Sequence, residues 1–176
     1  MTNKFKSNGK TLEDLRQSYG EINVLPGNEQ IVACENTHSK YFDVYCNGNL
    51  VARYVDKIGY TASIIACQLY NGVVQLYNIK KHKIISSIED VELLDNSCGT
   101  FENKLGYIII KGNKASEPSD YTVMVIEDSY GVIKHKFKSP FEITVYAVKD
   151  EIFIQVAKHK AVKYNVDTFA YRIEII

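Results

Sequence analysis

Three Lys-His-Lys tripeptides are the residues in this chain whose types could most directly do chemistry. They are Lys81-His82-Lys83, Lys134-His135-Lys136 and Lys158-His159-Lys160. Because histidine exchanges protons near neutral pH and lysine stabilises negative charge, three such tripeptides on one face could bind nucleic acid or cleave RNA. The first falls in an expected turn, the second within an expected strand and the third after one. We therefore expect solvated lysine-rich segments rather than one shared site.

Other catalytic patterns are missing from the sequence. There is no glycine-rich phosphate loop and no Gly-x-Ser-x-Gly elbow, and the four histidines are widely spaced. The carboxylates of Glu89-Asp90 and Asp150-Glu151 are adjacent, so their side chains point apart on a strand or turn. We predict a protein that is not an enzyme and that needs no cofactor and no metal.

The four cysteines, Cys34, Cys46, Cys67 and Cys98, show no Cys-x-x-Cys spacing, which argues against a zinc site or a redox motif. We predict free thiols. Cys34 and Cys67 lie inside apolar runs, where cysteine behaves as a small hydrophobic residue.

Charge is segregated along the chain although the formal net charge is zero. Residues 85–128 carry nine acidic residues and three lysines, whereas residues 134–163 carry seven lysines and three acidic residues. An acidic surface suits docking to a basic protein, because complementary potentials accelerate association and set the register of binding. Exposed tyrosines would serve as aromatic anchors there. The predicted partner-binding residues are Glu89, Asp90, Glu92, Asp95, Glu102, Asp128, Tyr60, Tyr70 and Tyr130.

The elements that would position these residues recur along the chain. Ile31-Val32-Ala33-Cys34-Glu35 reappears as Ile64-Ile65-Ala66-Cys67-Gln68, 33 positions later. Four units follow, each an apolar run upstream of two strand-like runs joined by a short turn, spaced by roughly 33 to 45 residues. The upstream runs are Ile31–Cys34, Ile64–Leu69, Gly106–Ile110 and Glu151–Val156. The paired runs are Tyr41–Cys46 with Leu50–Val55, Val73–Ile79 with Ile84–Ile88, Tyr121–Ile126 with Val132–Phe137, and Val162–Val166 with Phe169–Ile175.

Local signals fix the ends of several of these elements. Asn47-Gly48 between two β-rich runs predicts a tight type I′ hairpin turn, since both residues tolerate positive φ. Thr11 as a cap, with Asp14 three residues later, predicts one short helix that ends before Gly20. We divide the chain into an N-terminal helix and lead-in over residues 1–27 and four β repeats over residues 28–176.

The segment Ile64–Ile88 resembles a blade of the WD-repeat propeller family. Tyr77-Asn78 stands where that family usually has its Trp-Asp pair, and Asn71-Gly72 stands at its usual Asp-Gly turn. The resemblance implies a propeller-like array of about four antiparallel blades. A two-sheet β-sandwich built from successive meanders is the alternative.

The fold expected is therefore all-β and a single domain over residues 1–176. The longest apolar runs are far shorter than the roughly 20 residues that a bilayer requires, and no signal-peptide pattern is present, so we expect a cytoplasmic protein.

The leading functional hypothesis is a non-enzymatic protein-binding module, such as a bacterial inhibitor or immunity protein that blocks a partner toxin or enzyme. Two alternatives stay open. One is a nucleic-acid-binding or RNA-cleaving protein that uses the Lys-His-Lys tripeptides. The other is a structural subunit that completes a larger propeller with a second copy.

Overall fold

The structure is a computed structural model of the chain. It describes residues 9–26, 30–100, 106–112, 119–127, 131–139, 144–148, 151–157, 160–165 and 171–175. Beyond residue 93 the description is of the backbone, with side chains at a few positions only. The chain divides into two compact units, residues 1–58 with 64–89 and residues 59–63 with 90–176. A single domain over residues 1–176 stays a prediction.

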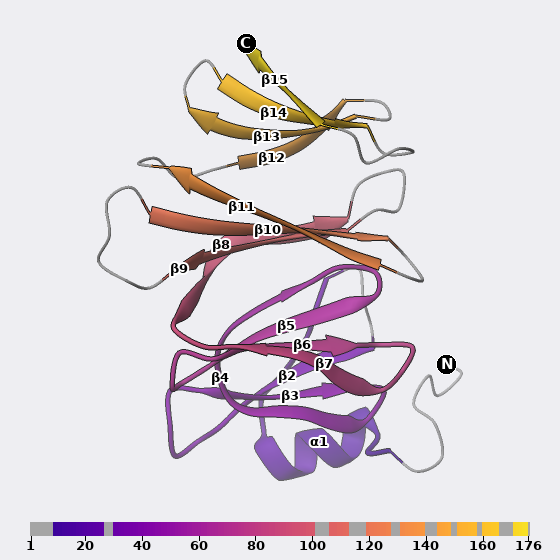
Figure 1. The fold of residues 1–176 in the computed structure, drawn as a ribbon. Coiled ribbons are helices and arrows are strands. Elements are labelled where there is room, and N and C mark those ends of the chain that lie inside the picture. Colours follow the sequence, from indigo (N-terminus) through magenta and orange to yellow (C-terminus); the bar gives the residue numbers. More distant parts are fainter. Residues whose placement is uncertain are drawn as a thin grey trace. The chain divides into compact units, whose positions relative to one another are not determined.

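One short helix, α1 (Leu12–Tyr19), precedes the strands (Figure 1). The Asp14 amide donates to Thr11 Oγ1 at 3.1 Å, and the Thr11 amide donates to Asp14 Oδ2 at 2.9 Å, which forms a capping box. The Gly20 amide closes the helix on the Arg16 carbonyl at 2.8 Å, with φ of 80° at Gly20. The helix predicted from Thr11 and Asp14 is confirmed. Among the described residues no helix is long and apolar enough to span a bilayer.

Apart from turns and short connections, the rest of the described chain is strand. The strands are β1 (Ile22–Val24), β2 (Ile31–Glu35), β3 (Phe42–Cys46), β4 (Asn49–Tyr60), β5 (Ile64–Leu69), β6 (Val74–Asn78), β7 (Lys83–Ile88), β8 (Val91–Thr100), β9 (Gly106–Gly112), β10 (Ser119–Glu127), β11 (Gly131–Ser139), β12 (Thr144–Val148), β13 (Glu151–Ala157), β14 (Lys160–Asn165) and β15 (Tyr171–Ile175).

These strands form three sheets in which each strand lies beside its neighbour in the chain. The orders are β1 to β7 in a seven-stranded sheet, β8 to β11 in a four-stranded sheet and β12 to β15 in another. Every strand pair whose register is described is antiparallel. The predicted all-β, antiparallel character is confirmed.

All four predicted three-strand groupings are present, as β2-β3-β4, β5-β6-β7, β9-β10-β11 and β13-β14-β15. Their grouping into sheets differs from the expectation, because β4 continues past Val55 to Tyr60 and joins the first two groups in one sheet. No propeller is identified in the described part of the chain.

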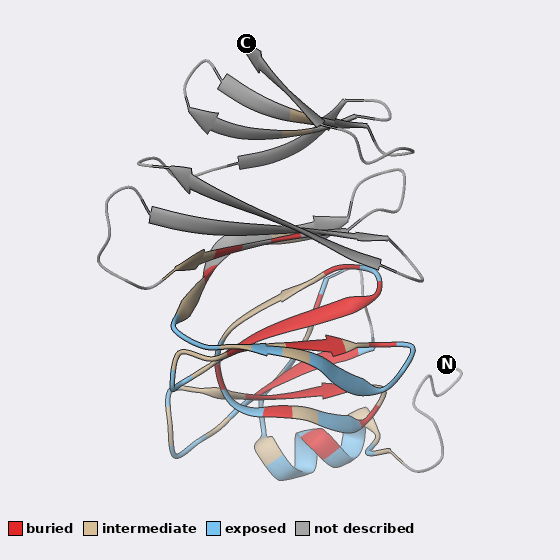
Figure 2. Ribbon diagram, in the orientation of Figure 1, coloured by how far each residue is buried: buried red, intermediate tan, exposed pale blue. Residues whose placement is uncertain are grey.

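The first unit has a core built from strands that are buried along most of their length (Figure 2). Ile31 to Cys34 on β2 and Ile64 to Cys67 on β5 are all buried, which is the pattern of a strand covered on both faces. Helix α1 adds Leu15, which is fully buried with Val32, Cys34 and Tyr45.

The described cysteines are free thiols, as predicted, and Cys34, Cys46 and Cys67 are buried. Burial raises the pKa of Cys46 to about 11. Burial also raises the pKa of Cys34 to about 11, with a further contribution from the negative charge of Asp43.

We predict that the three buried thiols are protected from an alkylating reagent in the native protein at pH 8. Cys34 and Cys46, whose pKa values are raised from 9.0 to about 11, form roughly 100-fold less thiolate at that pH, and Cys67 is protected by its burial. Mass spectrometry of the timed reaction should find at most Cys98, which is partly exposed, modified early, and all four modified in urea. Equal rates at all four cysteines in the folded protein would contradict this burial.

The predicted Asn47-Gly48 turn is confirmed, with φ of 51° and 79°. The lead-in to α1 packs directly on this turn, since the Lys10 amide donates to the Gly48 carbonyl at 2.8 Å. A Cβ atom added at Gly48 would meet the Lys10 backbone, and one added at Gly9 would lie 2.6 Å from the Asn47 carbonyl oxygen. Glycine is therefore required at Gly48 both for the turn and for this close backbone approach.

Gly48→Ala should lower the free energy of unfolding more than Gly72→Ala does. Gly72 has nearly the same φ, 81°, but a Cβ there would meet nothing within 4 Å. Gly72→Ala, the control, should lower the free energy of unfolding by about 1 kcal/mol, because alanine is strained in the left-handed backbone conformation. Gly48→Ala should lower the free energy of unfolding by about 1–3 kcal/mol more than that, because the Lys10 backbone must shift to make room for the new Cβ atom. Urea denaturation measures both, and equal losses would show that the lead-in does not pack here.

Candidate functional site

The Lys-His-Lys tripeptides occupy unlike places in the described structure. His82 is exposed in the turn between β6 and β7, with φ of 52°. His135 lies within β11, paired across the ladder with Val123. Residues 158 and 159 lie outside the described residues. Among the side chains that the structure describes, no group of histidine, cysteine and carboxylate residues could hold a metal ion.

The predicted partner-binding residues fall in both units. In the first unit, Glu89 is exposed directly after β7, and Tyr70 is exposed in the turn between β5 and β6. In the second unit, Asp90 is exposed, while Tyr60 and Glu92 are partly buried on β4 and β8. Asp95 belongs to β8, where only its backbone is described. Glu102, Asp128 and Tyr130 lie outside the described residues.

Tyr70 is part of an aromatic group that the sequence did not reveal. Its ring centroid lies 6.0 Å from that of Tyr41 and 5.8 Å from that of Tyr54, in tilted and edge-to-face arrangements. Tyr70 is 63% exposed and Tyr54 is 45% exposed. We call Tyr41, Tyr54 and Tyr70 the tyrosine cluster. Three separate segments of the first unit contribute to it.

Tight turns hold two of the three tyrosines. The Leu69 amide donates to the Val73 carbonyl at 2.8 Å and the Val73 amide donates to Asn71 Oδ1 at 3.2 Å, so the turn that carries Tyr70 is closed on itself. Tyr41 follows a turn that begins at Asn36, and the Tyr41 amide donates to Ser39 Oγ at 3.2 Å. These hydrogen bonds fix the backbone of the turns that carry Tyr70 and Tyr41.

Tyr54 is held in an unusual backbone conformation. Its φ is 54°, in the left-handed region, at a place where the register between β3 and β4 shifts. A bulky residue in that region costs roughly 1–2 kcal/mol, and it persists only where the surroundings determine it. Here the Tyr54 carbonyl accepts a bond from the Tyr70 amide at 3.0 Å, which ties the two most exposed rings together.

The buried side chain of Asp43 on β3 stabilises the left-handed conformation of Tyr54. Its side chain is 2% exposed, and it accepts hydrogen bonds from the Tyr54 amide at 3.4 Å, Arg53 Nη1 at 3.2 Å and the Tyr19 hydroxyl at 2.8 Å. Tyr19 also lies 3.0 Å from the hydroxyl of Tyr45. A buried carboxylate needs such partners, because an unpaired charge in the interior is strongly unfavourable.

The Tyr19 hydroxyl stays protonated in this environment. Burial, followed by its hydrogen bonds to Tyr45 and Asp43, raises the pKa of Tyr19 well above its ordinary value of 10.0. The hydroxyl is thus a permanent donor to the Asp43 carboxylate. One buried carboxylate consequently links helix α1, β3 and the strained residue of β4.

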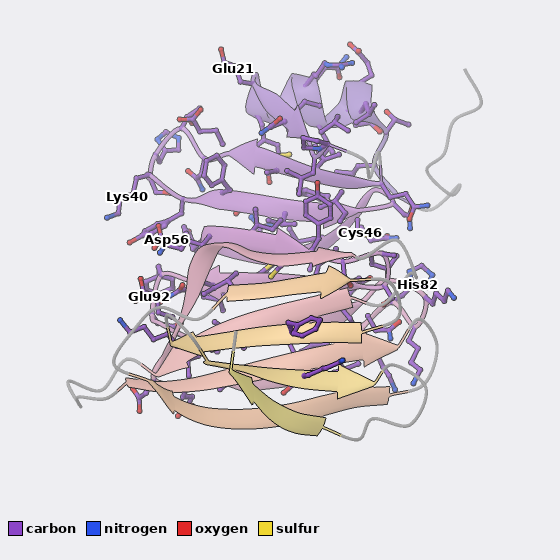
Figure 3. All side chains as sticks on the ribbon, turned by 90° about the horizontal axis from the view of Figure 1, so that it is seen from above. Glu21, Lys40, Cys46, Asp56, His82 and Glu92 are labelled. Atoms are coloured by element: carbon purple, nitrogen blue, oxygen red, sulfur yellow. The ribbon has the colours of Figure 1, made fainter. Side chains whose placement is uncertain are left out.

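The ends of the first unit differ in chemistry (Figure 3). Lys40 and Asp56 lie at one edge of the unit, and Cys46 and His82 lie toward the other. Glu89 belongs to the same end of the sheet as Tyr70, since Ile88 pairs with Val74, the first residue after the Tyr70 turn. The tyrosine cluster and one predicted acidic contact therefore share an end. Exposed Lys80, Lys81 and His82 occupy the turn between β6 and β7, and exposed Lys83 begins β7.

The chain matches no protein-family model and no curated protein. The resemblance to WD repeats accordingly stays a prediction. What the site can do follows from its own chemistry, which is that of rigid, exposed aromatic rings beside charged side chains.

We predict that Asp43→Asn lowers the free energy of unfolding by about 1–3 kcal/mol, because hydrogen bonds to a charged acceptor are lost in the interior. Arg53 is 57% exposed, so its share of this loss is small. Asp56→Asn, at an exposed position two residues beyond Tyr54, is the matched control and should change stability by less than about 0.5 kcal/mol. Urea denaturation separates the two, and equal effects would remove Asp43 from its anchoring role.

Proposed function

We propose that this protein is a non-catalytic protein-binding module whose contact surface includes the tyrosine cluster. The observation that carries the proposal is that Tyr70 and Tyr54 are exposed while their backbones are fixed by hydrogen bonds. Tyrosine provides a large contact area with little conformational freedom to lose, and it is enriched among the residues that dominate binding energies. A rigid, exposed pair of rings is thus suited to recognition.

The strained backbone at Tyr54 supports the same proposal. An uncommon left-handed residue held by a buried carboxylate is a feature that clusters at binding and switch regions. Because the conformation exists before any partner arrives, binding would not have to order it.

The chemistry of the partner follows from the carboxylates at this end of the unit. Glu89, one of the acidic residues predicted to bind a partner, is exposed at the same end of the sheet as the Tyr70 turn. A basic partner protein would be attracted and oriented by such a charge. The narrower form of the proposal is an inhibitor or immunity protein that uses this surface to cover a basic toxin or enzyme.

The finer description of the fold is likewise a proposal. We propose that the four three-strand groups are degenerate blades of the propeller type, with the seven-stranded sheet holding the first two. The support is their common meander order and the confirmed turn positions in the first two groups.

Tyr70→Ala should strongly reduce retention of the partner without unfolding the protein. The full-length protein, immobilised, is incubated with a lysate of the cells that encode it, and retained proteins are identified by mass spectrometry. His82→Ala, at the opposite end of the unit, is the matched control. We expect one protein held by the wild type and by His82→Ala, and at least about tenfold less of it held by Tyr70→Ala.

Retention of the same protein by Tyr70→Ala at the wild-type level would contradict the proposal. The nucleic-acid alternative gives a different pattern, namely RNA binding that weakens steeply with salt and is reduced by Lys81→Gln but not by Tyr70→Ala. That result would favour the exposed lysine turn as the functional surface instead.

A further inference from the structure

The ring faces of the tyrosine cluster are suited to a cation. An aromatic face carries negative electrostatic potential, and a cation within about 6 Å of the ring centroid is attracted to it. Lys40 already uses this attraction, since its Nζ atom lies 5.4 Å from the centroid of Tyr41. Within the described residues, no cation lies over the rings of Tyr54 or Tyr70. Two of the three rings are thus available to a cation from outside.

Three exposed carboxylates lie on segments next to those that carry the rings. Glu35 is exposed opposite Phe42, the neighbour of Tyr41, Asp56 is exposed two residues after Tyr54, and Glu89 is exposed beside the Tyr70 turn. None of these three carboxylates has an ion pair within the part of the chain that the structure describes. They can therefore bind a cation contributed by another molecule.

The basic side chains near the cluster are largely engaged or less exposed. Arg53 is paired with Asp43, Lys40 lies over Tyr41, and Lys57 is only partly exposed. A phosphate backbone would meet unpaired carboxylates here, which disfavours nucleic acid at this end. A cationic side chain meets both complementary charge and aromatic faces.

We propose that the tyrosine cluster receives an arginine side chain of the partner protein. The guanidinium group is planar and weakly hydrated, so it stacks on an aromatic ring while its N–H groups bind a carboxylate. Tyr70 and Tyr54 supply the rings, and Glu89 and Asp56 are exposed carboxylates on the segments next to them. This inference rests on the proposed function and adds the chemistry of the contact.

The test uses the full-length, isotope-labelled protein and short glycine-serine peptides with one central arginine or one central citrulline. Citrulline has nearly the shape of arginine but no charge, so it isolates the cationic contribution. We expect the arginine peptide to shift the amide signals of Tyr54 and Tyr70 in a saturable titration, and the citrulline peptide to bind at least about fivefold more weakly. Equal affinities for the two peptides would overturn the proposal.

Two variants sharpen the result. Tyr70→Leu keeps an apolar side chain but removes the aromatic face, and it should weaken binding of the arginine peptide about fivefold, with an otherwise unchanged amide spectrum showing that it is folded. Lys40→Met removes a competing cation and should strengthen binding about twofold. His82→Ala should bind as the wild type does. Unchanged affinity in Tyr70→Leu, or shifts centred on the turn at His82, would contradict the assignment.

The two proposals can fail separately. If Tyr70→Ala loses the partner but Tyr70→Leu keeps it, and citrulline binds as arginine does, the cluster is an apolar docking site and only the arginine inference is wrong. If Tyr70→Ala keeps the partner, the proposed function itself is wrong.

Discussion

The carboxylate of Asp43 is the constraint on which the first unit depends. A charged side chain that is 2% exposed is stable only with several hydrogen-bond donors, and the donors to Asp43 come from α1, from the Arg53 side chain and from the Tyr54 backbone. Satisfying this one charge therefore places the helix against the sheet. It also compensates the left-handed backbone of β4, which would otherwise relax to an ordinary strand.

The position of the tyrosine cluster on the surface depends on these buried hydrogen bonds of Asp43. Because Tyr54 is held in place, its carbonyl can accept the bond from the Tyr70 amide, and the turn between β5 and β6 is aligned with β4. Tyr41 completes the cluster from the loop before β3. Preorganised aromatic rings lose little freedom on binding, so recognition is a use that matches how this structure is built.

Much of the fold could be predicted from the sequence, and less of the site. Repeated apolar runs and the Asn47-Gly48 turn predicted the strands of the four groups, and Thr11 with Asp14 predicted the helix. The strand β8 was not predicted, because Asp95 lies within a segment of low β propensity. The strand β12, Thr144–Val148, was not predicted either, although its β-branched residues could have indicated it. Tyr70 was predicted, but Tyr41 and Tyr54 were not, since a turn and a register shift bring them together. Asp43 had a signal that went unused, a charge inside an apolar run.

Amide hydrogen exchange of Asp43→Asn against the wild type tests the central claim most directly, namely that the buried carboxylate holds the tyrosine cluster. The account predicts a local effect, in which protection at the Tyr54 and Tyr70 amides falls at least about tenfold while that of the Ile65 amide on β5 changes little. Unaltered protection at Tyr70, or a uniform loss across the first unit, would contradict it.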